Sequence, residues 1–280
     1  MAKPEYRFLT NEPTEDDILM DRYFLYIDIL GFADLVLKQP ERVKDLYELV
    51  STLNAHRHQS FGTIVFSDTI LVYPKIELNS GQQTDAYLVM YLCEFAQDLL
   101  YRLANRDIWF RAILTQGKFT HYLINNIPCY YGPALVEAYL ADKNCNLNAV
   151  GLFMDRKCTE RSTVFDSTSF NDSYDFVYLW QSLDDFEPNG FSPFPFEDPL
   201  DLTEADLQWK LAQDALMLRN IWQNRSATNP RVKQKHENTW NLLHARYGTI
   251  LDALEANNFN PSVFCSKYEW TAAIERAKSL

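Results

Sequence analysis

The apolar run RYFLYIDIL, residues 22–30, limits the folds open to this chain more than any other segment. Its aromatic and β-branched residues predict a buried strand, because such side chains pack well on a pleated surface. One position breaks the pattern, since Asp28 places an ionisable carboxylate inside this run. Burying a charge is costly unless it is paired or bound. The plain alternative is an Asp at a strand end, bonded to nearby backbone amides.

The segments that follow predict the order strand, helix, hairpin, helix, strand. Helical spacing covers residues 41–56, two strands are joined at Ser67 and Asp68 in FGTIVFSDTILVYPKI, and an amphipathic helix covers residues 84–105. IWFRAILTQGKFTHYLI supplies another strand, and GPALVEAYLADK is a helix with Pro133 near its first turn. This order predicts an α+β fold with a ferredoxin-like β-α-β-β-α-β core, an antiparallel sheet and helices on one face.

The composition changes beyond this core. The stretch DDFEPNGFSPFPFEDPLD is acidic and rich in Pro and Phe, which is typical of an irregular connector packed by its own aromatic side chains. We therefore expect a domain over residues 1–182, a connector over 183–201 and a C-terminal helical appendage over 202–280. In the appendage, Thr203 with Asp206 predicts a capping box and Pro230 opens a second helix.

Charge and cysteine content exclude several classes of protein. The 280-residue chain has a formal net charge of −12, which argues against a general nucleic-acid binder. Its most apolar helix is interrupted by Glu94, Gln97 and Asp98, and its first residues are too polar for a signal peptide, so no membrane association is expected. Five cysteines without C-x-x-C spacing predict neither a disulfide framework nor a zinc site. These features favour a reduced, cytoplasmic protein.

Asp28 and Asp68 are expected to converge. Asp68 lies at the tip of the predicted hairpin, and in a ferredoxin-like sheet the first strand lies beside that hairpin. Two close carboxylates repel each other unless a cation lies between them, and Mg²⁺ or Mn²⁺ is the simplest such cation. In DILGFADL the chain turns into a helix through Gly31, so the first helical amides are free to bind an anion. Together these groups suit a nucleoside triphosphate with two metal ions.

At these residues the chain resembles the class III nucleotidyl cyclases. YIDILGF is similar to their F-x-D-I-x-G-F motif, and FSDTILVY resembles their second motif, with Ser67 in place of the usual glycine. RAILTQG, beginning at Arg111, is similar to their R-x-G-I-x-x-G strand. The resemblance covers residues 22–155, about half of the chain. It implies metal binding at Asp28, Ile29 and Asp68, and nucleotide binding at positions that include Gly31 and Phe32.

The departures from that family bear on the base. The positions that read a purine are Ile64 and Cys129 here, and the usual Asn and Arg fall on Val136 and Leu140. GPALVEAY instead resembles the helix of the bacterial pyrimidine cyclases of the Pycsar antiphage system. That resemblance implies conversion of UTP or CTP, with UTP preferred, into a cyclic nucleotide that activates a separate effector during phage infection.

The resemblance also implies a head-to-tail homodimer with shared active sites. One subunit would supply Asp28 and Asp68, and its partner would supply groups from the Arg111 strand and the 132–143 helix. Two alternatives stay open at this point. The chain could be a cyclase fold that binds a nucleotide or a protein without turnover, or a purine cyclase with an atypical base pocket.

Overall fold

The computed structural model describes residues 19–53, 58–75, 82–125 and 127–279. The chain forms two compact units. The first comprises residues 1–99, 110–147 and 151–177, and the second comprises residues 100–109, 148–150 and 178–280. The second unit therefore includes two short segments that lie between parts of the first unit in the sequence. The domain boundaries expected from the sequence, at residues 182 and 202, divide the chain into consecutive stretches. They therefore assign residues 100–109 and 148–150 to the first domain.

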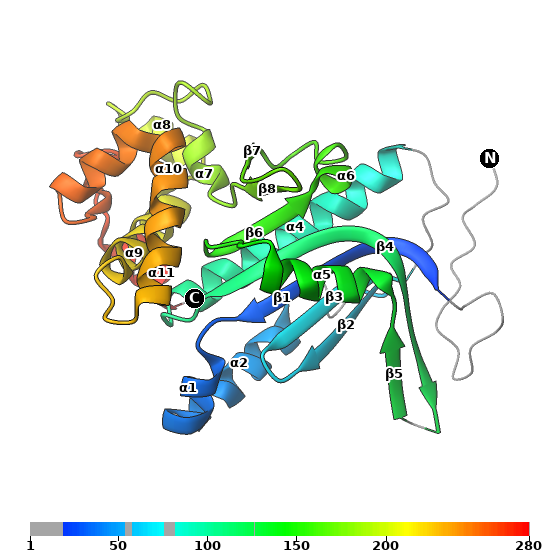
Figure 1. Ribbon diagram of the computed structural model, residues 1–280. Helices are drawn as coiled ribbons and strands as arrows, with labels where there is room; N and C mark the ends of the chain where they lie inside the picture. Colours follow the sequence, from blue (N-terminus) through cyan, green and yellow to red (C-terminus); the bar gives the residue numbers. More distant parts are fainter. Residues whose placement is uncertain (1–18, 54–57, 76–81, 126, 280) are drawn as a thin grey trace. The chain divides into compact units, whose positions relative to one another are not determined.

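The first unit is built on one mixed sheet (Figure 1). Its strands follow the order β2-β3-β1-β4-β6-β8-β7, with β5 paired to β4. All pairs are antiparallel except β4 with β6. The order β2-β3-β1-β4 is that of the predicted ferredoxin-like core. The strands are β1 (Met20–Ile29), β2 (Phe61–Phe66), β3 (Thr69–Pro74), β4 (Phe110–Ile124), β5 (Ile127–Tyr131), β6 (Gly151–Asp155), β7 (Ser167–Ser169) and β8 (Tyr174–Val177).

Helices cover both faces of this sheet, whereas the sequence predicted them on one face. Figure 1 shows α5 (Pro133–Asn144) in front of the sheet and α4 (Gln82–Ala104) behind it. Consistent with this, Phe24, Leu25, Tyr26 and Ile27 are all buried, although successive residues of a strand point to opposite faces. The short crossover from β4 through β5 carries α5 to the second face. The other helices of this unit are α1 (Phe32–Lys38), α2 (Pro40–Thr52) and α6 (Arg156–Thr159).

Two local predictions in this unit are confirmed and one is partly outside the described residues. The hairpin turns at Ser67 and Asp68, with Phe66 opposite Thr69. Pro133 stands at the start of α5. The expected helix over residues 41–56 appears as α2, which ends at Thr52, and residues 54–56 lie outside the described part of the chain.

The second unit is helical, as expected, but its first long helix begins differently. It contains α7 (Gln181–Asp184), α8 (Pro199–Glu204), α9 (Gln208–Asn224), α10 (Pro230–Ala256), η2 (Pro261–Val263) and α11 (Thr271–Ser279). The predicted capping box is wrong, because Thr203 lies inside α8 and its hydroxyl donates to the Leu200 carbonyl. Pro230 does begin α10, which Asn229 caps.

The acidic connector is packed by its aromatic side chains, as predicted. Phe186 is buried, and its ring lies 5.5 Å from the ring of Phe194 and 5.4 Å from that of Phe196. Phe264, from the last part of the chain, stacks on Phe186 at 5.6 Å. This cluster orders an irregular segment by hydrophobic burial without a helix or strand.

Candidate functional site

The ends of β1 and of the β2–β3 hairpin bring Asp28 and Asp68 together. Asp28 is the register partner of Thr69, so it lies beside the turn that contains Asp68. The backbone N–H of Ile29 donates to the carbonyl of Asp68 at 2.8 Å, which fixes the turn against the end of β1. Both aspartates are half-buried. The predicted convergence is therefore present in the fold, and Ile29, which has no side-chain donor, presents only its backbone to the site.

The environment of Asp28 disfavours its charged form. Burial raises the pKa of Asp28 to about 6, and the neighbouring carboxylates of Asp142 and Asp68 contribute to the rise. Arg111 and Lys143 act in the opposite direction. A raised carboxylate pKa at a strand end marks a place where a bound cation would be favourable, because the cation would stabilise the ionised form.

Arg111 lies in the same chain and beside Asp28, which differs from the expectation that it serves a partner's site. The two residues are opposite each other on β4 and β1. Arg111 is buried, and its Nη2 lies 3.8 Å from Oδ2 of Asp28. Its Nε donates to Oδ1 of Asp142 at 2.6 Å, and its Nη1 donates to the carbonyl of Leu147 at 3.1 Å. These bonds hold the guanidinium within its own chain, beside Asp28.

Asp142 and Lys143, at the end of α5, are site residues that the sequence did not reveal. The Asp142 side chain is fully buried and also forms an ion pair with Nη2 of Arg111. Lys143, which is half-exposed, lies 3.0 Å from Oδ2 of Asp142, and this contact raises the pKa of the lysine. A buried arginine on a strand requires an acidic partner, but sequence spacing does not say which one.

Gly31 forms the turn that leads from β1 into α1. Its φ of +73° is in the left-handed region that favours glycine. The amides of Asp34 and Leu35 both donate to the Gly31 carbonyl, and the helix begins at Phe32, whose side chain is buried. The turn is exposed at Gly31 and directly follows the carboxylate strand, which is the place expected to contact phosphate, whereas Phe32 is buried.

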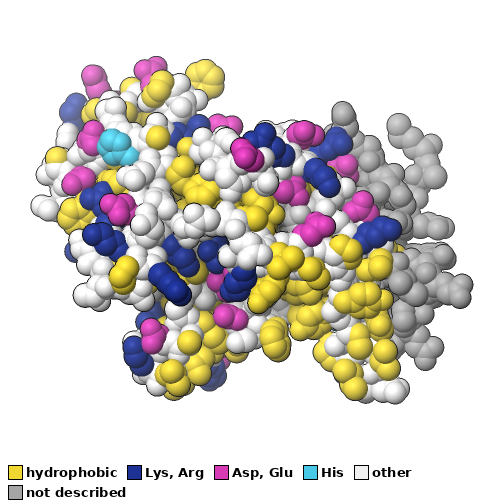
Figure 2. Space-filling view, viewed as in Figure 1, with side chains coloured by type: hydrophobic (Ala, Val, Ile, Leu, Met, Phe, Trp, Pro, Cys, Tyr) yellow, Lys and Arg dark blue, Asp and Glu magenta, His cyan; other side chains and the backbone are white. Residues whose placement is uncertain are grey.

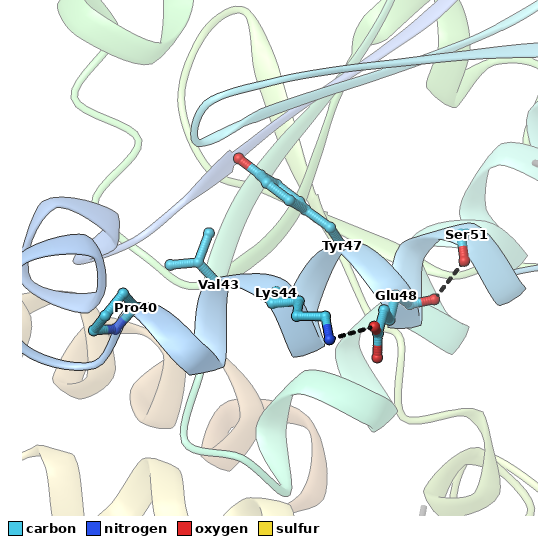
Figure 3. Close-up of a pocket in the computed structure, with 6 residues that line it drawn as sticks. All are labelled: Pro40, Val43, Lys44, Tyr47, Glu48 and Ser51. Atoms are coloured by element: carbon cyan, nitrogen blue, oxygen red, sulfur yellow. Dashed lines mark hydrogen bonds and ion pairs between the residues drawn. The ribbon is translucent and has the colours of Figure 1, made fainter.

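Tyr47, on α2, supports the hairpin turn and was not singled out from the sequence. Its hydroxyl donates to the carbonyl of Ser67 at 3.1 Å. Ser67 has a φ of +54°, a left-handed conformation that glycine adopts more readily than serine. Tyr47 also lines an open groove of about 520 Å³ on the outer face of α2, and it points away from Lys44 and Glu48 (Figure 3).

The two expected base-reading positions do not lie together in one chain. Ile64 is on β2, opposite Leu71 and therefore close to the carboxylate end of the sheet. Cys129 is on β5, opposite Tyr122, whereas Asp28 is opposite Arg111 on the same strand β4. Eleven positions of β4 (122 − 111) separate these rows, on the order of 35 Å along a strand. A pocket that contains both Asp28 and Cys129 requires a second chain.

The donors at the carboxylate end suit a hard divalent cation. Two carboxylates and a backbone carbonyl at a strand end are oxygen ligands of the kind that Mg²⁺ and Mn²⁺ prefer. Within the described ranges, no cluster of three or more His, Cys, Asp and Glu side chains is arranged to hold a metal ion. Any metal here would therefore rely on Asp28, Asp68, backbone oxygen and a bound ligand or water.

Comparisons with known proteins find likeness only among solved structures. No family model and no curated protein matches the chain. The adenylyl cyclase CyaB from P. aeruginosa is 10% identical, with 57% of this chain and 94% of that chain covered and a TM-score of 0.40. The guanylyl cyclase domain of the RhoGC fusion protein from the aquatic fungus Blastocladiella emersonii is 14% identical, covering 57% and 96% at a TM-score of 0.41. Adenylate cyclases from Trypanosoma brucei give 13% identity, 56% and 88% coverage, and a TM-score of 0.37.

Matches at this level of similarity establish neither the family nor the activity of this chain. The evidence for a function therefore comes from this chain's own site residues, Asp28, Asp68 and the Gly31 turn. One general property is clear from the helices: none of those in the described part of the chain is both long enough and apolar enough to cross a bilayer.

Proposed function

We propose that this protein is a nucleotidyl cyclase that converts UTP, or CTP, into the 3′,5′-cyclic nucleotide and pyrophosphate. The observation that carries the proposal is the convergence of Asp28 and Asp68 beside the Gly31 turn. Paired carboxylates at a strand end beside an exposed glycine turn are complementary to a metal-bound triphosphate. The YIDILGF and FSDTILVY motifs support the same chemistry by resemblance.

Asp28 and Asp68, with the backbone of Ile29, would hold Mg²⁺ or Mn²⁺, two ions per site. Such ions, when bound, make a hydroxyl a better nucleophile at neutral pH and neutralise developing charge on the phosphates. The chain's own part is to place the carboxylates, to present the Gly31 and Phe32 amides to the phosphates, and to keep Arg111 within reach of the site. The ribose 3′-hydroxyl then displaces pyrophosphate at the α-phosphorus in line.

The proposed assembly is a homodimer with two shared sites. Figure 2 shows hydrophobic side chains gathered over α5 and the β4–β5 arm, and six large ones are well exposed there. This α5–β5 surface consists of Ile124, Ile127, Tyr131, Val136, Tyr139 and Leu140. Exposed apolar patches of this kind mark interaction sites. Asp28 and Cys129 pair with positions of β4 that are far apart, so we expect a second chain, docked over this surface, to complete a base pocket.

Replacing Leu140 by Glu should separate the proposed dimer. Leu140 is 46% exposed and lies on α5, so a charge there would be buried without a partner on association. Analytical ultracentrifugation should show a monomer at concentrations at which the wild type is a dimer, together with loss of turnover. Leu200→Glu is the matched control, because Leu200 is an exposed leucine of α8 in the other unit. An unchanged Leu140→Glu dimer would overturn the assignment of this surface.

The proposed activity is tested directly by product analysis. The purified protein is incubated with all four ribonucleoside triphosphates and Mn²⁺, and products are identified by mass spectrometry, with Asp68→Ala as the control. Cyclic UMP or cyclic CMP from the wild type alone supports the proposal. Cyclic AMP or GMP would identify a purine cyclase with an atypical pocket, and binding of a nucleotide without any product would identify a binding module.

The proposed role in the cell is antiphage signalling through a separate effector that senses the cyclic nucleotide. It rests on the resemblance of GPALVEAY to the Pycsar cyclases. Expression of the wild type and of Asp68→Ala in a phage-challenged host, with measurement of cyclic nucleotides after infection, tests this role.

A further inference from the structure

The ion-pair network around Arg111 is not explained by the proposed reaction alone. Arg111 faces two carboxylates, and its contacts with them are unequal. Its Nε donates to Asp142 at 2.6 Å and its Nη2 is also paired with Asp142, whereas the nearest distance to Asp28 is 3.8 Å. The contact between Arg111 and Asp142 is a charge-assisted hydrogen bond, whereas the distance between Arg111 and Asp28 is too long for a hydrogen bond.

We propose that Asp142 is a positioning residue that holds the Arg111 guanidinium off Asp28, so that Asp28 stays available to a divalent metal ion. This inference rests on the proposed function of the site. The Asp142 side chain is fully buried at the end of α5 and is bonded across to β4, which makes its position well defined. The Nη1 bond to the Leu147 carbonyl holds the third nitrogen of the guanidinium on the same side.

The charges of the cluster show why this arrangement matters for a metal. Three carboxylates (Asp28, Asp68 and Asp142) face two cations (Arg111 and Lys143), so the cluster has a formal charge of −1. Without the charge of Asp142 the cluster is neutral, and Asp28 becomes the nearest carboxylate to a buried guanidinium. An unpaired buried charge is costly, so Arg111 would move onto Asp28 and compete with the metal.

Lys143 completes the arrangement from the solvent side. Its ammonium lies 3.0 Å from Oδ2 of Asp142, while Arg111 occupies Oδ1. The two oxygens of Asp142 are thus shared between an inner and an outer cation. Asp142 is therefore bound by both Arg111 and Lys143, and Asp28 has only the longer contact with Arg111, at 3.8 Å.

The test is a titration of the full-length protein with Mn²⁺ alone, up to millimolar concentration, with free Mn²⁺ measured by electron paramagnetic resonance. Asp142→Asn should weaken Mn²⁺ binding by about 10-fold or more, the range seen when groups that orient metal ligands are removed. The double variant Asp142→Asn with Arg111→Gln should restore binding to within about 3-fold of the wild type. A purely structural role for Asp142 predicts no such rescue.

Asp155→Asn is the matched control. Asp155 is an aspartate of the same sheet, at the end of β6, and it accepts hydrogen bonds from the amides of Gln116 and Cys158 rather than from Arg111. Its substitution should leave Mn²⁺ affinity unchanged. Circular dichroism of every variant confirms that the fold is present before the titration is interpreted.

A second measurement covers the case in which Asp142→Asn does not fold. Arg111→Gln alone should change Mn²⁺ affinity by less than about 3-fold, because Asp142 already neutralises this guanidinium. Tightening of 10-fold or more would show that Arg111 is mainly the counter-ion of Asp28, which overturns the proposal.

The outcomes separate this inference from the proposed function. Mn²⁺ binding by the wild type that Asp142→Asn leaves unchanged overturns the positioning role alone. The expected titrations without any cyclic nucleotide product overturn the cyclase proposal and leave the positioning role supported. Absence of Mn²⁺ binding by the wild type overturns the positioning role, and the product analysis then decides the cyclase proposal separately.

Discussion

Two aspartates, one in each unit of the molecule, have pKa values raised by burial and yet differ in what they can do. Burial raises the pKa of Asp28 to about 6 and that of Asp214, on α9, to about 7. Asp28 lies at the open end of a sheet with a second carboxylate and an exposed turn beside it. Asp214 is fully buried and accepts hydrogen bonds from Ser182 and, at 2.8 Å, from Tyr101.

The comparison shows that a perturbed pKa identifies a desolvated group and does not by itself identify a site. Asp214 has both of its carboxylate oxygens bonded to hydroxyls inside a helical core, which leaves no room for a ligand. Asp28 has one loose ion pair and half-buried surroundings. Access and unsatisfied coordination, rather than the shift, distinguish a candidate catalytic carboxylate from a structural one.

The largest expected difference between the two aspartates is in turnover. Asp28→Asn should lower the rate of cyclic nucleotide formation by roughly 100-fold or more, because it removes a metal ligand. Its free energy of unfolding should not fall, since the neutral amide avoids the cost of burying the charge. Asp214→Asn should leave turnover per folded molecule within about 3-fold of the wild type. Initial rates measure the turnover of the two variants, and urea unfolding measures their stability. Equal losses of turnover in Asp28→Asn and Asp214→Asn would contradict the different roles assigned to the two aspartates.

The second difference is in the pH dependence of stability. The pKa of Asp214 is higher in the folded state than in the unfolded chain, so its contribution to stability is fully present below about pH 4 and is lost as pH rises through about 7. Between pH 5 and pH 8 the wild type should therefore lose roughly 2–3 kcal/mol from this group, and Asp214→Asn should not. Asp28 titrates in both proteins, so the difference between their urea unfolding curves isolates Asp214. Parallel losses would show that Asp214 does not ionise over this pH range.

The smallest expected effects come from two tyrosine hydroxyls. Tyr47 donates to the turn beside Asp68, and Tyr247, in the helical unit, donates to Asp184 at 2.9 Å. Each Tyr→Phe change should cost about 0.5–1.5 kcal/mol of stability. Only Tyr47→Phe should also reduce turnover, by a few-fold, because it loosens the turn that positions Asp68. Steady-state kinetics of the two variants test this, and an equal effect on turnover would mean that the turn does not depend on Tyr47.

Much of the core and part of the site follow from local sequence. The apolar run of residues 22–30 indicates a strand, and the two-residue spacing at Ser67 and Asp68 indicates a hairpin, because both depend on backbone geometry over a few residues. The pairing of Asp28 with Asp68 follows once the strand order is assumed. The wrong capping box at Thr203 shows the limit of such patterns. Thr203 lies inside α8, and its hydroxyl donates to the Leu200 carbonyl of the same helix.

Local sequence patterns were enough to predict the α+β core, the carboxylate pair and the glycine turn, since each depends on neighbouring residues or on a common strand order. The folded arrangement was needed to show that Arg111 pairs with Asp142, 31 positions away along the chain, and that Asp28 and Cys129 align with distant positions of β4. Both depend on how α5 and β5 pack against β4. Packing of this kind depends on the shape of the whole core. An ion pair between residues far apart in the sequence produces no local sequence pattern from which it could be predicted.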